Sequence, residues 1–277
     1  MSIERRTLLK LLTAGAAGGV IGSLKVAVPD AATTSPDTTR QYEGANLSGW
    51  EVASGDSLYN CSGELAVTLA DIETVHQNTY SELKANIAPR KIRAHNITFK
   101  RFIDDTALNF IHIGGYKFRL PYLPQPDIGT ELNGQTIEGG LFVWDGVMEV
   151  LDKGIAFQWV VNPWNLGSIN TWDGTGWVEV GTLALDTVWH EVMLVVDYQR
   201  ELTALKIDGT PIPTLFSRTA KGGWDSNIAA RLQAEIISVD IEDACNMQAM
   251  HQAEFKDWYW YWEPARSCQT YLPMICN

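Results

Sequence analysis

The sequence predicts an all-β protein, an antiparallel β-sandwich or jelly roll, from three observations. Side chains alternate with a period of two, as over 116–120, where three apolar residues alternate with a lysine and an arginine. Turn dipeptides recur along the whole chain, with Asn133-Gly134 and Asp208-Gly209 as examples. No strand–helix–strand rhythm is present, and only 225–234 admits a short helix. Many short strands joined by frequent turns are typical of a sandwich.

The first 27 residues predict an export leader. Arg5-Arg6, followed by Leu8, Leu9 and Lys10, resembles the R-R-x-[FL]-L-K consensus of twin-arginine signals. The apolar run over 11–24 is too short and too glycine-rich for a comfortable membrane span. The resemblance implies export in the folded state, to the periplasm or the cell exterior. No second apolar stretch approaches a membrane span, so none is expected once the leader is removed.

The net charge limits the classes of molecule that the protein is expected to bind. The leader holds four of the 21 basic residues and one of the 33 acidic residues, so the remainder carries 17 against 32, a net charge of −15. Nucleic acids and anionic membranes bind clustered lysine and arginine. The composition therefore argues against both as partners and leaves neutral ligands open.

One domain follows the leader. Residues 28–46, rich in proline, threonine, alanine and aspartate, predict a cleavage region and a flexible linker. The β-sandwich is expected over 47–263, which is long enough for a sizeable core. An irregular tail follows over 264–277.

Four cysteines are an even number in a chain expected to be exported, which favours disulfides. Cys268 and Cys276 enclose a short loop and form one expected pair, which leaves Cys61 with Cys245. Four free thiols are the alternative, because twin-arginine cargo folds in a reducing cytoplasm.

The expected strands differ in character. The runs 155–161 and 192–196 are apolar on both faces, which is typical of central strands covered on both sides. In the last aromatic segment, three tryptophans alternate with Asp257 and two tyrosines, so one face is expected to join the core. Strands are predicted over 97–102, 116–120, 155–161, 192–196, 204–207 and 255–262.

One segment resembles the concanavalin A-like lectin/glucanase superfamily. Trp189-His190 leads into a strand over 191–197, and a second strand returns to Asp208-Gly209. The aromatic strand over 255–262 is similar to the closing strand of that superfamily. The resemblance covers 140–262 by motif and 47–139 by strand pattern only. It implies the fold and says little about activity.

The aromatic content favours a carbohydrate ligand. The chain has 11 tryptophans, and aromatic rings offer flat apolar area that covers the C–H faces of sugars. Tryptophans beside turn residues are the better candidates for ligand contact, since core tryptophans usually lie within strands. The expected substrate-binding residues are Trp164, Trp172, Trp177 and Trp224.

Glucanases of this fold place two carboxylates on one strand as E-x-D-x-E, the pair that glycoside hydrolysis requires. The nearest segment here is 238–242, with Asp240 and Glu242 in place. Ser238 stands where the first glutamate, the usual nucleophile, is expected. That departure argues against a retaining glucanase built on this motif.

A second enzyme reading comes from alginate-lyase-like jelly rolls. Segment 80–84 resembles their R-[ST]-E-L-R strand, and Phe255-Lys256 resembles their Y-F-K strand. The expected Q-[IV]-H reads Gln158-Trp159-Val160, so valine replaces the usual histidine base and His76 or His112 would have to substitute. The residues that would carry β-elimination in this reading are His112, Gln158, Tyr259, Lys84 and Arg119.

The resemblance to the concanavalin A-like superfamily also bears on the expected cofactors and function. The histidines show no metal-binding spacing, and His190 is expected to be structural. No cofactor is required, although sandwiches of this superfamily often hold a structural Ca²⁺, for which Asp257 is the candidate ligand. The first hypothesis is an exported carbohydrate-binding sandwich. The alternatives are a polysaccharide-degrading enzyme, lyase before hydrolase, and a cell-envelope structural protein; the sequence leaves catalysis open.

Overall fold

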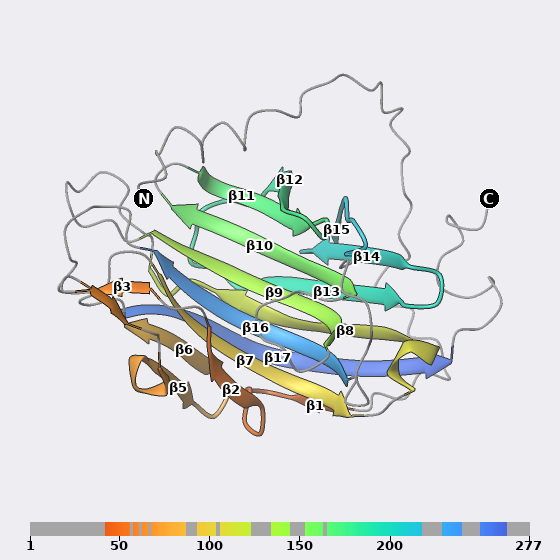
Figure 1. Ribbon diagram of the computed structural model, residues 1–277, viewed down its shortest axis with the longest axis horizontal. Helices are drawn as coiled ribbons and strands as arrows, with labels where there is room; N and C mark the ends of the chain where they lie inside the picture. The colour runs from red at the N-terminus through yellow and green to blue at the C-terminus, as the bar shows by residue number, and fades with distance from the viewer. Residues whose placement is uncertain are drawn as a thin grey trace, which may run out of the picture.

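The computed structural model arranges the chain as two antiparallel β-sheets packed face to face (Figure 1). It describes residues 42–55, 58–60, 63–65, 68–86, 93–103, 106–122, 134–144, 153–162, 165–217, 229–239 and 250–264. The predicted antiparallel β-sandwich is therefore confirmed. The helical segments among these residues are two 3-10 turns, η1 (Leu69–Asp71) and η2 (Ala107–Asn109).

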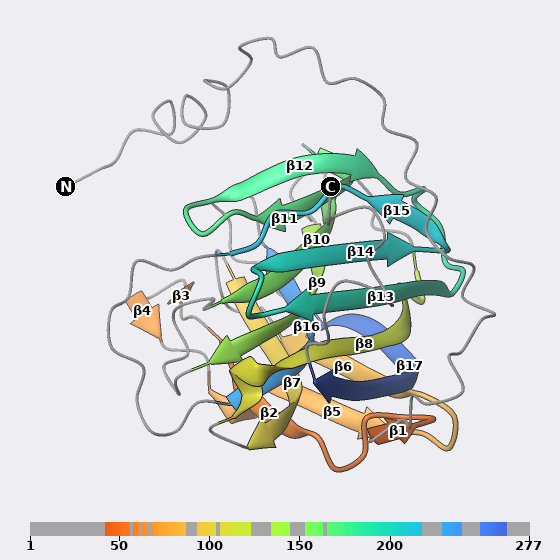
Figure 2. The same cartoon turned by 90° about the vertical axis from the view of Figure 1, so that its right-hand side faces the viewer.

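Sheet A faces the viewer in Figure 2. Its strand order is β15 (Thr210–Ile212), β14 (Leu202–Ile207), β13 (His190–Asp197), β8 (Phe110–Arg119), β17 (Met250–Pro264), β6 (Ser81–Asn86) and β5 (Ile72–His76), with β1 (Tyr42–Gly44) also paired to β17.

Sheet B covers the other side of the core. Its strand order is β12 (Trp177–Thr182), β11 (Asn165–Trp172), β10 (Gly154–Asn162), β9 (Gly134–Trp144), β16 (Ala229–Val239), β7 (Arg93–Ile103) and β2 (Glu51–Ser54). A separate small hairpin pairs β3 (Leu58–Asn60) with β4 (Gly63–Leu65).

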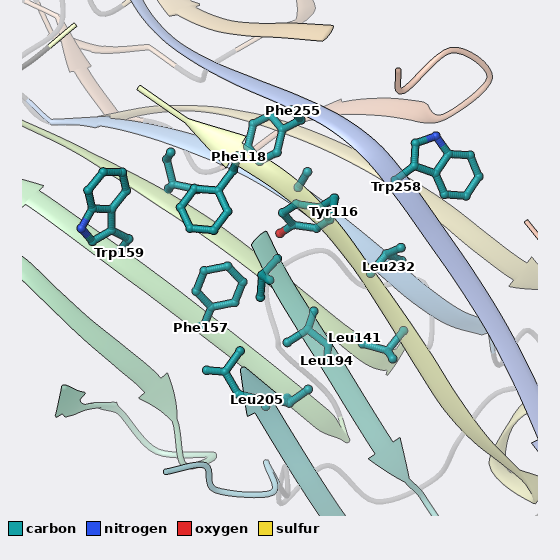
Figure 3. Packing of buried hydrophobic residues seen from close by; sticks show 14 of the residues in the cluster. Tyr116, Phe118, Leu141, Phe157, Trp159, Leu194, Leu205, Leu232, Phe255 and Trp258 are labelled. Atoms are coloured by element: carbon teal, nitrogen blue, oxygen red, sulfur yellow. The ribbon is translucent and has the colours of Figure 1, made fainter. Parts of the chain in front are cut away.

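The core forms because alternate side chains of both sheets point at one another. Tyr116 and Phe118 of β8 meet Phe157 and Trp159 of β10, and all four are fully buried (Figure 3). Intervening residues such as Lys117 point away from the core. The two expected central strands are central: β10 lies between β9 and β11, and β13 lies between β8 and β14.

The motif that ends at Asp208-Gly209 has a structural role. His190 is buried, and its two ring nitrogens contact the carboxylates of Asp208 at 2.7 Å and Asp186 at 3.0 Å. Asp208 also accepts a hydrogen bond from the backbone N–H of Glu191. Asp208 and Gly209 both have positive φ, as a tight two-residue hairpin requires. The histidine therefore ties the start of β13 to the β14–β15 turn.

Strand β17 changes its inward face at a bulge. Phe255 points into the core before the register shift between Lys256 and Tyr259, whereas Trp258, inside the shift, and Trp260, beyond it, are the next inward residues. Asp257 lies inside this shift with φ of 51°. The expectation that one face of this aromatic strand joins the core is confirmed, and the bulge adds Phe255 to that face.

The structure differs from the sequence predictions at three places. β1 pairs with β17 over Tyr42–Gly44, so the sandwich begins inside the segment 28–46 that was predicted to be a linker. β17 extends to Pro264, one position into the predicted tail. The segment 225–234, which admitted a short helix, forms no helix from 229 onward, because Ala229–Val239 is the strand β16 between β9 and β7. Within the described residues, no helix is both long enough and apolar enough to cross a membrane.

Candidate functional site on the outer face of sheet B

The outer face of sheet B carries a row of polar side chains across four adjacent strands. Asn170 of β11 lies opposite Gln158 of β10, Gln158 opposite Glu138 of β9, and Glu138 opposite Glu235 of β16. The next residue on each strand points into the core, as with Ile169, Trp159, Ile137 and Ile236. Glu138, Glu235 and Asn170 are nevertheless buried, with exposures of 7%, 3% and 9%. Buried carboxylates are uncommon and need partners.

Glu235 accepts hydrogen bonds at both carboxylate oxygens. His95 Nδ1 lies 2.6 Å from Oε1, and Gln233 Nε2 donates to Oε2 at 2.6 Å. His95 comes from the neighbouring strand β7, where it is diagonal to Glu235, and Gln233 precedes Glu235 by two positions on the same face. The backbone of Gly55 packs on the imidazole, and a Cβ there would lie 2.5 Å from His95 Cβ. Two donors and one close packing contact thus fix the orientation of this carboxylate.

Glu138 is held from the opposite side. Gln158 Nε2 donates to its Oε2 at 2.8 Å. Arg231 lies on the same face of β16, with its guanidinium carbon 4.1 Å from the centre of the Phe99 ring. Burial lowers the pKa of Arg231 to about 10, and the carboxylates of Glu235 and Glu138 oppose that shift. The guanidinium therefore stays charged at neutral pH and compensates part of the negative charge of the pair.

A hydrogen bond from sheet A stabilises the strands that carry the two glutamates. The Tyr116 hydroxyl crosses the core and donates to the backbone carbonyl of Gln233 at 3.0 Å. Gly139, next to Glu138, leaves room for that hydroxyl, because a Cβ at this position would collide with it. Burial raises the pKa of Tyr116 well above its usual value, so the phenol remains a neutral donor.

Two of the tryptophans expected to contact a ligand lie together beside this row. Trp172 and Trp177 are Cα partners on β11 and β12, and their rings meet edge to face with centroids 5.4 Å apart. Trp172 follows Asn170 by two positions, which places it on the same outer face. Both residues are partly exposed, although the ring nitrogen of Trp172 is buried. Trp164 and Trp224 lie outside the described residues.

The residues expected to serve a lyase are not brought together. Gln158 belongs to the outer face of sheet B, whereas Lys84, Arg119 and Tyr259 lie on the outer face of sheet A, across the thickness of the sandwich. Lys84 pairs with Glu82 at 3.1 Å, and Arg119 pairs with Glu254 at 2.6 Å. Tyr259 stacks on Tyr261.

His112 lies in the core between the sheets. It is fully buried, its Nε2 lies 2.9 Å from the carbonyl oxygen of Ala107, and aromatic rings surround it. Burial lowers its pKa to about 4. A side chain with no exposed surface is badly placed to remove a proton from a polymer. The alternative base, His76, bonds Ser81 on sheet A at 2.8 Å, which is also remote from Gln158.

Asp257, the expected Ca²⁺ ligand, has cationic neighbours. Its carboxylate lies 3.2 Å from Lys117 Nζ and 3.8 Å from Lys256 Nζ. No group of three or more histidine, cysteine, aspartate or glutamate side chains suited to a metal occurs in the described part of the chain. The surroundings of Asp257 therefore lend no support to the Ca²⁺ expectation. Asp240, Glu242 and the cysteines Cys61, Cys245, Cys268 and Cys276 lie outside the described residues.

The sequence pattern did not predict Glu138 and Glu235, because the expected carboxylate motif places both residues on one strand, whereas these two lie on β9 and β16. The available signal was weaker: a glutamate between two uncharged, non-polar residues within a predominantly apolar segment, as in Ile137-Glu138-Gly139 and Ala234-Glu235-Ile236. Burial of such a glutamate is costly unless it is partnered, so each is a candidate functional residue. Their juxtaposition depends on the pairing of β9 with β16, which are far apart in the chain.

No family model matches the chain, and no curated protein matches it either. Solved structures resemble it in shape. A protein of unknown function with a galectin-like fold from Bacillus subtilis matches over 82% of this chain and 97% of its own, at 11% identity and a TM-score of 0.45. The metal-free carbohydrate recognition domain of Emp46p matches over 78% and 88%, at 11% identity and a TM-score of 0.44.

Two enzymes are also similar in shape. A β-glucanase from Bacillus licheniformis matches over 76% of this chain and 91% of its own, at 12% identity and a TM-score of 0.42. A sialidase matches over 70% of this chain, which spans only 16% of the length of that enzyme, at 8% identity and a TM-score of 0.43. Sequence identities and TM-scores this low show no shared activity. Only this chain's own residues therefore bear on its function.

Proposed function

We propose that the protein binds carbohydrate on the outer face of sheet B. The observation that carries the proposal is the combination on one face of a partly exposed tryptophan pair, Trp172 and Trp177, with the row of amide and carboxylate side chains beside it. Sugar rings present apolar C–H faces and equatorial hydroxyl groups. An aromatic platform next to fixed hydrogen-bonding groups complements both.

The charge of the site favours neutral over anionic polysaccharides. Two buried carboxylates face one buried guanidinium at this site, and the whole chain has a net charge of −12. An anionic polymer such as a uronate would meet like charge on this face. A neutral polysaccharide is therefore the proposed ligand, in place of the uronate that an alginate-lyase-like activity would need.

Replacing Trp177 with alanine should weaken glycan binding by about 1–2 kcal/mol, roughly 5- to 30-fold in Kd, through loss of the aromatic area that covers the sugar. The melting temperature should change little, because Trp177 is partly exposed at a hairpin. Affinity electrophoresis in native gels containing laminarin, barley β-glucan, xyloglucan or galactan, with alginate as an anionic comparator, measures the first quantity. Thermal unfolding measures the second.

Trp189→Ala is the matched control. Trp189 is also partly buried, but it lies on the outer face of sheet A, between Arg119 and Lys256 at 4.5 Å from each. This variant should bind glycan as the wild type does. The proposal fails if none of the neutral polymers retards the wild type, or if Trp189→Ala weakens binding as much as Trp177→Ala.

We propose in addition that the protein is exported by the twin-arginine pathway, on the strength of Arg5 and Arg6 with the leucines and lysine behind them. Replacing both arginines with lysine should leave the full-length protein in the cytoplasm, because the pathway reads the arginine pair. Cell fractionation followed by immunoblotting checks this. Normal export of the double variant would exclude the pathway and leave the glycan-binding proposal untouched.

A further inference from the structure

The outer face of sheet A has a charged end and an apolar end. Lys117 of β8 and Glu191 of β13 lie at the charged end, where the Lys117 side chain is 36% exposed and Glu191 is exposed. Further along the same two strands, Ile111 and Ile113 of β8 and Val195 of β13 form an apolar cluster. All five side chains point away from the core, because they alternate with the inward residues of their strands.

The apolar end extends across four adjacent strands. Val195 lies opposite Ile113 on one side and Ala204 of β14 on the other, and Tyr261 of β17 lies opposite Ile113 (Figure 2). Tyr261 also stacks on Tyr259, with ring centroids 6.2 Å apart. Directly opposed side chains on one face of a sheet pack against each other. The resulting continuous surface, called the sheet A patch below, consists of Ile111, Ile113, Met193, Val195, Ala204, Tyr259 and Tyr261.

The aliphatic side chains of the sheet A patch are buried although they point outward. Ile111, Ile113 and Val195 are 6%, 4% and 9% exposed. The tyrosine rings shield the patch on the β17 side, but Val195 lies two strands away from β17. Lys206, the partner of Met193 on β14, is only 6% exposed as well. A lysine on a bare sheet face would extend its ammonium group into water. These exposures therefore indicate that further chain covers this end of the face.

The described elements do not supply that cover. Within the described residues, the strands that pack on sheet A as a second layer belong to sheet B and lie on its inner face. The small hairpin of β3 and β4 lies beside β7 of sheet B. The cover is therefore expected from a segment outside the described residues.

The C-terminal segment begins at the edge of the sheet A patch. β17 ends at Pro264, and Glu263 is paired with Ile111. The 13 residues that follow, 265–277, span about 43–47 Å when extended. Crossing the patch from β17 to β14 takes three strand spacings, about 14 Å. The segment is thus long enough to cross the patch.

Composition also favours the C-terminal segment. It contains the run Tyr271-Leu272-Pro273-Met274-Ile275, which is apolar throughout. The segment 28–41 reaches sheet A at the same end, because β1 is antiparallel to β17, but it is rich in threonine, aspartate and other polar residues. Burial is favourable in proportion to the apolar area removed from water. The run 271–275 is therefore the better match to an apolar surface.

We propose that residues 265–277 pack on the sheet A patch as a third layer, with 271–275 in contact with Ile113 and Val195. The segment is tethered at the edge of the patch, so its effective concentration there is about millimolar. A second copy of the chain at micromolar concentration would compete poorly. The two outer faces then differ in use: the chain itself occupies the apolar end of sheet A, and sheet B is left for ligand. This contact does not depend on glycan binding.

A photo-crosslinker identifies what covers the patch. Met193→p-benzoylphenylalanine places the probe on the sheet A patch of the full-length protein. Glu191→p-benzoylphenylalanine is the matched control, two positions earlier on the same face of β13 and at its charged end. After irradiation of dilute protein, mass spectrometry should locate the cross-link from position 193 within 265–277. Position 191 should give no cross-link to that segment above the level of an unirradiated sample.

Oxidative footprinting tests the contact without changing any residue of the sandwich. The full-length double variant Leu272→Asp/Ile275→Asp should increase the rate of hydroxyl-radical oxidation of Met193 at least about threefold, because susceptibility follows exposure. Gln269→Asp/Thr270→Asp is the matched control, since it adds the same charge at polar positions of the same segment. Its Met193 should be oxidised at the wild-type rate.

The other outcomes overturn the proposed contact. A cross-link from position 193 to 28–41, to another segment of the chain or to a second molecule would do so, as would no cross-link from this position. Equal oxidation of Met193 in the wild type and in Leu272→Asp/Ile275→Asp would also overturn it. Glycan retardation in native gels should be the same for the wild type and all four variants. A failure of this contact is therefore distinguishable from a failure of glycan binding, which the wild type alone decides.

Discussion

Replacing Trp260 with alanine should lower the free energy of unfolding by about 3–5 kcal/mol. The ring is fully buried and packs against Tyr42 of β1, Phe102 of β7, His112 of β8 and Trp262 of β17, with centroid separations of 5.7–6.4 Å. These partners come from both sheets. The substitution therefore removes transferred apolar area and leaves a cavity where the two sheets meet.

Trp260→Phe is the informative comparison. The indole N–H of Trp260 is buried without a hydrogen-bond partner, so phenylalanine keeps most of the packing and removes an unsatisfied donor. Its loss of stability should be clearly smaller than that of the alanine variant in urea unfolding. Equal losses for the two variants, or an alanine loss below about 1 kcal/mol, would show that this aromatic cluster does not join the sheets.

Acidification from pH 7 to pH 5 should destabilise the protein by about 4 kcal/mol through two buried histidines. Burial lowers the pKa of His112 and of His251 from 6.5 to about 4. The unfolded state therefore binds more protons than the folded state in this window, and stability falls as the pH decreases from about 6.5 toward 4. Each group contributes about 1.4 kcal/mol per pH unit below 6.5, or about 2 kcal/mol at pH 5.

Urea unfolding at pH 7, 6 and 5 measures this dependence. The double variant His112→Gln/His251→Gln is the control, because it removes both titrating groups, and its free energy of unfolding should change much less over the same interval. Carboxylates contribute mainly below this window, since Glu82 and Asp173 have pKa values lowered from ordinary values near 4. A wild type as stable at pH 5 as at pH 7 would contradict the burial of these imidazoles.

The sequence by itself determined the fold class. Period-two alternation over 116–120, runs such as 155–161 and the Asp208-Gly209 turn are local signals, and each corresponds to a strand or turn in the structure. Such signals suffice because the burial of alternate side chains is decided within one strand. They fail at 225–234, a segment that admitted a short helix, while the tertiary structure makes 229–239 the strand between β9 and β7.

Only the tertiary structure decided the site. Glu138 and Glu235 are separated by almost a hundred positions and meet because β9 and β16 pair in one particular register, which no local pattern encodes. The expected lyase set was dispersed for the same reason: strand order sends Gln158 to one outer face, Lys84, Arg119 and Tyr259 to the other, and His112 to the core. Trp172 and Trp177 are Cα partners that flank a single hairpin, so their proximity is local. Residues within one strand or turn are placed by the sequence, whereas residues on different strands are placed by the sheet.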